Sequence, residues 1–235
     1  MEKFNYNDLF EYELVRSKRK TIGIVIKTGG EVIIKAPAHL SIKDIEQCLG
    51  QKKNWIVQKI KQMKEQLKMV PVKTYETGDY MYYLGEEYQL VRKPAIIGRR
   101  VYVRLEENNI VVYGKFEHSD QVRQALEIWY QQKAAIWMTK RLHYFKEQIG
   151  VDYRKVSFRS PKTRWGSCSS AKNIMLNWKL IMAPSEIIDY VICHELCHLL
   201  EMNHSSAFWS LVEKQIPDWK ERRSWLKKNG IILNV

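Results

Sequence analysis

The chain has 235 residues, 45% of them hydrophobic and 28% charged, which is enough apolar material for a sizeable core and excludes a disordered or fibrous protein. The first 20 residues lack the apolar segment of a secretory signal, and no run is long enough to span a membrane. The four cysteines show no disulfide framework. We therefore expect one large or two small globular domains in a reducing, cytoplasmic compartment, without membrane contact.

The net charge is +13, with basic clusters at residues 18–20, 52–64 and 99–100. A surface of this kind attracts nucleic acid or acidic partners non-specifically, because binding releases counterions. The alternative is an ordinary solvated surface whose charge keeps the protein soluble. No nucleic-acid-binding motif accompanies the charge, which favours this alternative.

Strands and helices are both expected in the first 70 residues. Two β-branched runs, residues 21–27 and 31–35, are separated by a Thr-Gly-Gly turn and predict a β-hairpin. Ser41 is followed by an aspartate three residues later, which resembles a capping box and predicts a helix as far as Gly50. A second helix, residues 55–67, would carry apolar side chains on one face and lysines on the other.

The middle of the chain changes from strands to one long helix. Four strands are expected, at residues 80–83, 88–92, 101–105 and 110–113. Apolar and aromatic residues then recur at helical spacing over residues 119–150. This change in composition predicts two domains: residues 1–116, a β-rich amino-terminal subdomain with a basic helical segment, and residues 117–235.

The last third of the chain is expected to be mostly helical. Residues 156–159 and 173–182 predict strands on either side of a turn-like segment at residues 163–170. The next helix, from about Pro184 to Glu201, is apolar nearly all round and should be buried in the domain. Two further helices are predicted at residues 206–215 and 219–228, and their aromatic residues should hold the preceding loop against the core.

The buried helix carries the pattern H-E-x-x-H at His194, Glu195 and His198. Positions four apart lie above one another on a helix, so His194 and His198 can direct ring nitrogens at one metal ion. Glu195 then lies beside the ion without binding it. In this pattern two histidines hold zinc, and the glutamate takes a proton from the water that zinc activates.

A catalytic zinc site normally has three protein ligands, and two residues could supply the third. Glu201 would lie about 10 Å along the axis of an unbroken helix, too far for ligand bonds of roughly 2 Å. His204 is the better candidate, provided that the chain ends the helix and reverses. Asn203 tolerates the left-handed conformation that such a reversal uses. We therefore expect one zinc ion per chain on His194, His198 and His204.

The residues of this motif could have other roles. The histidines could be solvated or hydrogen-bonded residues of an ordinary helix, or ligands of a structural zinc in a basic binding module; structural sites, however, usually have four ligands, often cysteines. Cys193 and Cys197 project from a different helical face and are poor candidates for a nucleophile. Arg164 and Tyr190 could stabilise an oxyanion or could be structural.

The segment Asn173–Lys179 could pair with an extended substrate at a sheet edge. Trp165 and Cys168, in contrast, are expected to be structural residues around the cleft and to take no part in the chemistry. The predicted partner of the site is a protein or peptide substrate.

Several segments together resemble the YgjP-like metallopeptidase family. They are residues 163–169 (Thr-Arg-Trp-Gly-Ser-Cys-Ser), residues 190–199 around the histidine motif, Asn203-His204-Ser205 and Phe208-Trp209. The resemblance implies a zincin-type active-site helix, with zinc on His194, His198 and His204 and Glu195 as the general base. The family is related to the SprT and WLM zinc peptidases, some of which digest proteins bound to DNA. A DNA-associated peptidase is therefore an alternative function.

The spacing of the three histidines also equals that of metzincins. Glu201, however, stands where metzincins have glycine, and no methionine follows His204 to form their Met-turn. Membership of that group is therefore rejected. The expected fold is α+β: the β-rich amino-terminal subdomain with helices, followed by a mostly helical zincin-like metallopeptidase domain with a small sheet.

Overall fold

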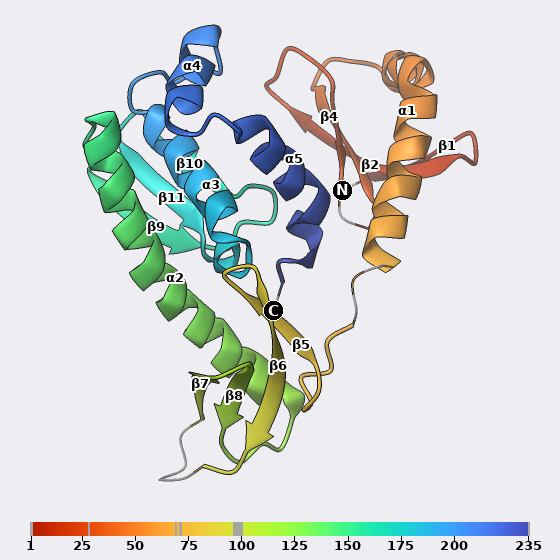
Figure 1. Ribbon diagram of the computed structural model, residues 1–235. Coiled ribbons are helices and arrows are strands. Elements are labelled where there is room, and N and C mark those ends of the chain that lie inside the picture. Colours follow the sequence, from red (N-terminus) through yellow and green to blue (C-terminus); the bar gives the residue numbers. More distant parts are fainter. Residues whose placement is uncertain (1, 28, 69, 71, 96–100, 235) are drawn as a thin grey trace. The chain divides into compact units, whose positions relative to one another are not determined.

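A computed structural model describes residues 2–27, 29–68, 70, 72–95 and 101–234 of the chain. The fold is α+β, as predicted, with three small mixed sheets and five α-helices in the described residues. The chain divides into two compact units, Met1–Pro71 and Val72–Val235 (Figure 1). Within the described residues, no helix is both long and apolar enough to cross a membrane.

The first unit is a four-stranded sheet covered by one long helix. The strands are β1 (Glu2–Tyr6), β2 (Phe10–Ser17), β3 (Gly23–Ile26) and β4 (Val32–Pro37), followed by α1 (Ile42–Lys68). Their order in the sheet is β1-β2-β4-β3, with only β2 and β4 parallel. The predicted hairpin is therefore confirmed as the β3–β4 pair at one edge of the sheet.

Helix α1 begins where the sequence predicts it to begin, but it does not end at Gly50. The Ser41 hydroxyl accepts from the Asp44 amide and donates to the Asp44 carboxylate, which confirms the expected cap. Ile45, Leu49 and Ile56 of α1 then pack on the sheet in one continuous core. A side chain at position 50 would come 3.0 Å from the Tyr6 hydroxyl. Gly50 therefore serves close packing against the sheet, and the prediction of two separate helices was wrong.

The second unit contains a four-stranded sheet at the start and a three-stranded sheet later in the chain. The first comprises β5 (Tyr80–Tyr83), β6 (Glu86–Lys93), β7 (Tyr102–Glu106) and β8 (Asn109–Tyr113), in the order β5-β6-β8-β7. All four strands were predicted. The basic pair at residues 99–100 lies outside the described residues.

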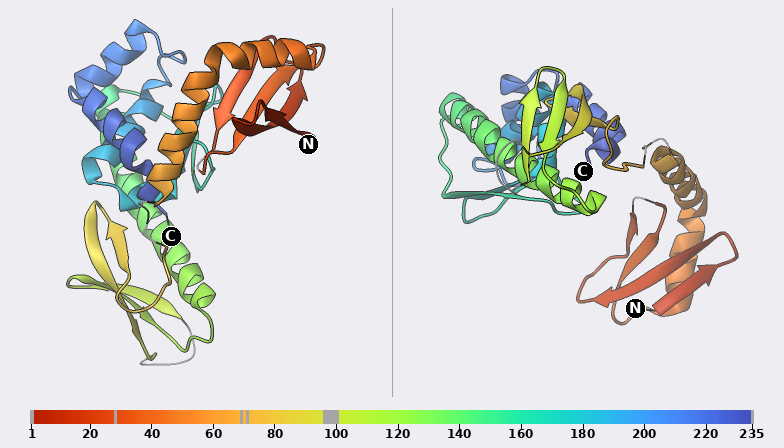
Figure 2. Two further views of the ribbon diagram at one scale, coloured as in Figure 1. Left: turned by 90° about the vertical axis from the view of Figure 1, so that its right-hand side faces the viewer. Right: turned by 90° about the horizontal axis from the view of Figure 1, so that it is seen from below.

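Helix α2 (Ser119–Ile149) connects both sheets of the second unit into one core. One end packs beside β7 and β8, and the other lies beside β9 of the second sheet (Figures 1 and 2). Leu126, Tyr130 and Met138 are fully buried along its length, and the Tyr130 hydroxyl donates to the Tyr82 carbonyl at 2.7 Å. The predicted domain boundary between residues 116 and 117 falls inside this unit, whereas the compact units divide between residues 71 and 72.

The second sheet lies next to the predicted active-site helix. It comprises β9 (Lys155–Arg159), β10 (Gly166–Cys168) and β11 (Asn173–Asn177), in the order β10-β11-β9. Two expectations need correction here. The turn-like segment at residues 163–170 contains the short strand β10, and the predicted strand at residues 173–182 changes after Asn177 into a 3₁₀-helix, Trp178–Met182.

Three α-helices complete the unit: α3 (Ser185–Cys197), α4 (Ser206–Gln215) and α5 (Trp219–Asn229), followed by a 3₁₀ turn, Gly230–Ile232. Helix α3 is shorter than predicted, because tight turns follow it. The Leu199 and Leu200 amides donate to the carbonyls of Leu196 and Cys197, three residues earlier. The reversal does not use a left-handed Asn203, since Asn203 is not among the described residues with positive φ.

Two contacts fix the position of α3. The Leu84 and Gly85 amides donate to the Ile181 and Met182 carbonyls, just before α3 begins, and a side chain at position 85 would come 2.8 Å from Pro184 Cα. Farther along, Arg141 of α2 binds the Asp189 carboxylate of α3 through two hydrogen bonds of 2.7 Å.

The Arg141–Asp189 pair should therefore contribute to stability. In Arg141→Met the half-buried Asp189 carboxylate loses its partner, and we expect the free energy of unfolding to fall by about 1–3 kcal/mol. Arg123→Met is the matched control, since the ion pairs of Arg123 in the described part of the chain are with Asp120 and Glu127 of its own helix. A loss below about 0.5 kcal/mol is expected there. Urea unfolding of both variants measures the difference, and equal losses would contradict it.

Candidate metal centre

Helix α3 is buried on almost every side, as predicted. Its buried residues are Ile187, Ile188, Tyr190, Val191, Ile192, Cys193, Glu195, Leu196 and Cys197. Buried polar groups are normally hydrogen-bonded, because desolvated polar groups are costly. His194 Nδ1 is buried without a hydrogen-bond partner in the described residues, which makes the carboxyl-terminal end of α3 a candidate functional site.

The structure brings His194, His198 and His204 into one cluster. The ring centroids lie 4.9 Å apart for His194 and His198, 5.0 Å for His194 and His204, and 4.7 Å for His198 and His204. One ligand atom from each ring lies within 4.8 Å of those from the other two. His194 Nε2 and His204 Nε2 are 3.1 Å apart. The residues predicted to be ligands thus converge on one point.

Phe208 and Trp209 hold the exposed His204 in this cluster. The Ser205 hydroxyl accepts from the Phe208 amide at 3.3 Å and caps α4, so His204 directly precedes a fixed helix start. The buried Phe208 ring lies 4.4–4.9 Å from all three imidazole rings. Trp209 stacks on His204 at 5.5 Å and on Trp219 at 4.1 Å. The prediction that these aromatic residues hold the His204 loop is confirmed.

Glu201 acts through its backbone. Its carbonyl oxygen lies 3.0 Å from His198 Nδ1. When Nδ1–H donates to this carbonyl, the Nε2 lone pair of His198 is left for the cluster. Among the described residues, Glu201 is not part of the cluster that could hold a metal ion, in agreement with its exclusion as a ligand.

Burial favours the neutral form of two of these histidines, His194 and His198. Burial lowers the pKa of His194 to about 3, with further lowering by His198 and His204. The pKa of His198 is also lowered, chiefly by burial. Neutral imidazole is the form that binds metal, so no proton has to be displaced at these two rings near pH 7.

Glu195 is only 6% exposed and lies against strand β10. A Cβ at Gly166 would come 2.5 Å from Glu195 Oε1, so only glycine lets the strand pass this close. Burial raises the pKa of Glu195 to about 8, and Arg164 opposes this rise. A divalent cation beside Glu195 would lower the pKa again, because it favours the carboxylate. Glu195 is therefore a buried carboxyl group whose desolvation favours the protonated form.

The cluster opens into a pocket of about 240 Å³. It is lined by Gly166, Ser167, Cys168, His194, Glu195, His198, Met202 and His204. Strand β10 forms one wall and the loop after α3 the other. Glu195 and the three imidazoles thus face the same small space.

The structure also places the two candidate oxyanion residues and the two cysteines of α3. Neither Arg164 nor Tyr190, the candidate oxyanion residues, lines this pocket. Burial raises the pKa of Tyr190 to about 12, and its ring packs against His194. Cys193 and Cys197 are fully buried free thiols, which agrees with their rejection as nucleophiles.

The strand predicted to pair with substrate cannot do so. Strand β11, which begins at Asn173, has β10 on one side and β9 on the other. The edge strands are β10 and β9, and of these two β10 lines the pocket. This role was missed because Gly166–Cys168 is too short to show alternation; only its pairing with β11 makes it a strand.

The donor set fits a zinc ion. Tetrahedral zinc with Zn–N bonds of about 2.0–2.1 Å places its ligand nitrogens roughly 3.3 Å apart. The 3.1 Å separation of His194 Nε2 and His204 Nε2 is close to this value. Three clustered imidazoles, a buried glutamate beside them and an open pocket are the features of a metal-dependent hydrolase.

Comparison with known proteins identifies the class as a metallopeptidase. Residues 20–229 match the family described as "YgjP-like, metallopeptidase domain", and the chain belongs to this family. The predicted resemblance is thereby confirmed. No curated protein matches the chain.

Two solved structures of archaeal metallopeptidase zymogens are similar to part of the chain. Abylysin of Pyrococcus abyssi is 30% identical over 38% of this chain and 93% of its own, with a TM-score of 0.35. Jannalysin of Methanocaldococcus jannaschii is 18% identical over 37% of this chain and 90% of its own, with a TM-score of 0.34.

Gly166 should be needed for the position of Glu195. In Gly166→Ala the new methyl group displaces the carboxylate, and we expect peptidase activity to fall by about 100-fold, because small misplacements of reacting groups are costly. Metal content should stay unchanged, since the contact is with Glu195. Adding the same substitution to Glu195→Ala, which removes the clash, should cause no further loss. Lost metal, or full activity, in Gly166→Ala would contradict this account.

Proposed function

We propose that the protein is a zinc-dependent peptidase that holds one zinc ion on His194, His198 and His204 and uses Glu195 as general base. The observation that carries the proposal is the convergence of the three imidazoles beside the buried carboxylate of Glu195, in a pocket open to a sheet edge. Membership of a metallopeptidase family supports it.

When bound, zinc supplies a Lewis acid that polarises the scissile carbonyl and acidifies water. Glu195 accepts the proton of the attacking water and passes it to the leaving amine. Its burial suits this role, because a carboxylate with little solvation is a stronger base than an exposed one. The contact with Gly166 keeps the carboxylate on the pocket side of α3.

Strand β10 is the proposed support for the substrate backbone. Its outer edge is unpaired within the described residues, and all three of its residues line the pocket. An extended peptide can add to such an edge by backbone hydrogen bonds. The substrate class is therefore a protein or peptide segment in extended conformation.

A reducing cytoplasm is the proposed compartment. The thiols of Cys193 and Cys197 are free although they lie 3.9 Å apart, which suits a reducing environment.

The ligand assignment predicts that alanine substitutions of the three histidines weaken zinc binding, whereas substitution of the neighbouring Glu201 does not. His194→Ala, His198→Ala and His204→Ala should each weaken zinc binding by at least about 100-fold, because three ligands share one ion. Glu201→Ala is the matched control: it keeps the backbone carbonyl that His198 uses, so zinc should stay bound. The zinc content of each variant is measured by metal analysis after dialysis. Stoichiometric zinc in His194→Ala would show that the ligand set is wrong.

The general-base assignment makes a separate prediction. Glu195→Gln should fold and retain zinc, while hydrolysis of a protein substrate falls by about 10²–10⁴-fold, the usual contribution of a positioned base. Activity of the purified variant is compared with its zinc content in the same sample. A zinc-loaded Glu195→Gln protein that cleaves at the normal rate would remove Glu195 from the mechanism.

A further inference from the structure

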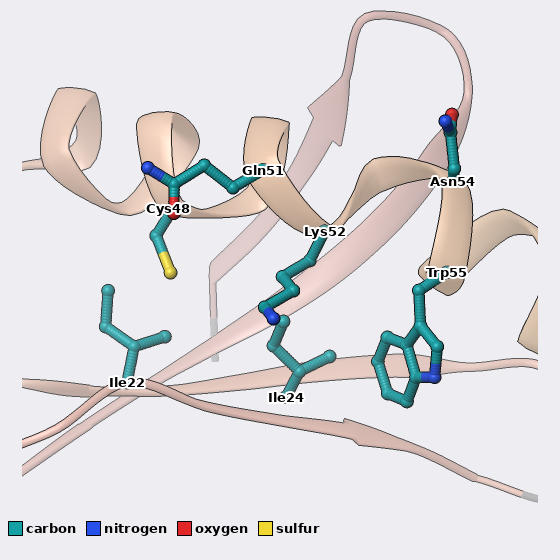
Figure 3. Close-up of a pocket in the computed structure, with 7 residues that line it drawn as sticks. All are labelled: Ile22, Ile24, Cys48, Gln51, Lys52, Asn54 and Trp55. Atoms are coloured by element: carbon teal, nitrogen blue, oxygen red, sulfur yellow. The ribbon is translucent and has the colours of Figure 1, made fainter.

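The first unit has a groove of about 630 Å³ between helix α1 and strand β3. Ile22 and Ile24 form its floor, and Cys48, Lys52 and Trp55 reach down from α1 (Figure 3). Trp55 is 51% exposed, although it is the largest side chain at the groove. The groove is large enough for apolar side chains of a ligand.

Strand β3 is the edge strand beside this groove. The Lys27 amide donates to the Glu31 carbonyl, so Lys27 and Glu31 form a hydrogen-bonded pair. In an antiparallel ladder, hydrogen-bonded and non-hydrogen-bonded pairs alternate. The next hydrogen-bonded pairs of β3 and β4 are therefore Val25–Ile33 and Gly23–Lys35. The backbone groups of Ile24 then point away from β4. Within the described residues no strand pairs with this side of β3, so these groups can bond one more strand.

The two faces of this edge differ in chemistry. Ile22 and Ile24 face α1 and its groove. Gly23 faces the opposite side, where a Cβ would come 2.8 Å from the Arg19 guanidinium. Arg19 Nε is buried without a hydrogen-bond partner, and no ion pair of Arg19 occurs in the described part of the chain. A strand added to β3 would therefore meet an apolar groove on one face and an unpaired cation on the other.

We propose that the β3 edge binds an extended peptide segment in which apolar residues alternate with acidic ones. Successive side chains of a strand point to opposite faces, so apolar side chains would enter the groove while acidic ones meet Arg19. Lys52 at the groove mouth adds to the attraction, and basic residues outnumber acidic ones in residues 1–71. This site lies in the first unit and does not depend on the proposed zinc chemistry.

A peptide explains these features better than a nucleic acid does. Trp55 could stack on a base, and Lys52 could bind a phosphate. The free backbone edge, however, offers hydrogen bonds in the spacing of a second polypeptide strand. The apolar floor of Ile22 and Ile24 requires apolar side chains that a phosphate backbone does not provide.

Binding is tested with the full-length Glu195→Gln protein, so that the probe cannot be cleaved by the proposed base. The probe is a fluorescein-labelled ten-residue peptide of alternating glutamate and leucine, and anisotropy is the readout. A peptide of alternating lysine and leucine and a 15-nucleotide oligothymidylate serve as comparison ligands. We expect the acidic peptide to bind at least about 10-fold more tightly than the basic one.

Substitutions locate the binding surface. Trp55→Ala should weaken binding of the acidic peptide by about 10-fold, and Arg19→Ala and Lys52→Ala should each weaken it by about 3-fold. Val57→Ala and Lys53→Ala are matched controls on α1, since both side chains are exposed and neither lines the groove. They should change the affinity less than about 2-fold. Circular dichroism verifies that each variant is folded.

Cys48 supplies a second readout at the groove itself. In a Cys168→Ser background it is the accessible thiol that remains, because Cys193 and Cys197 are buried. The acidic peptide should slow alkylation of Cys48 by at least about 5-fold at saturation.

Five results would overturn the proposal. Four concern the ligands: equal binding of the acidic and basic peptides, an affinity unchanged in Trp55→Ala, unprotected Cys48, and oligothymidylate binding that depends on Trp55 while the peptide does not bind. The fifth is a dimer in sedimentation that Trp55→Ala dissociates, which would assign the edge to a second copy of this chain.

Discussion

The site depends on the contact of one buried ring, Phe208, with all three imidazoles. His194 and His198 come from α3, whereas His204 lies on the loop before α4, so no single element can hold the three together. Phe208 contacts the two histidines of α3 as well as His204, because the Ser205 cap fixes the start of α4 directly after His204. The core thereby extends to the metal centre and orients its rings, which is the rigid support that such a site needs.

A second constraint is the close approach of β10 to α3. The Gly166 backbone passes so near the Glu195 carboxylate that a single methyl group would not fit. The same short strand is the open edge of its sheet and a wall of the pocket. One close contact thus positions the proposed base and places an edge for an extended peptide beside it. The burial that raises the pKa of Glu195 follows from the same packing.

The sequence predicts best what depends on local periodicity. The four-residue spacing of His194 and His198 puts them on one face of α3 wherever that helix lies, and the axial distance that excludes Glu201 holds for any α-helix. Features that depend on tertiary contact were missed. Gly50 serves contact with Tyr6 and does not end α1, and β10 is a strand only because β11 pairs with it. The reversal after α3 needs no left-handed Asn203, because tight turns begin at His198.

In the proposed centre three imidazoles and no other side chain hold a zinc ion beside Glu195. X-ray absorption at the zinc edge of the purified protein tests this ligand set. We expect nitrogen ligands at about 2.0–2.1 Å, three of them imidazole, one further light-atom ligand from solvent and no sulfur. Sulfur at about 2.3 Å, the distance of a cysteine ligand such as Cys168 beside the pocket, or four protein ligands closing the site, would contradict it.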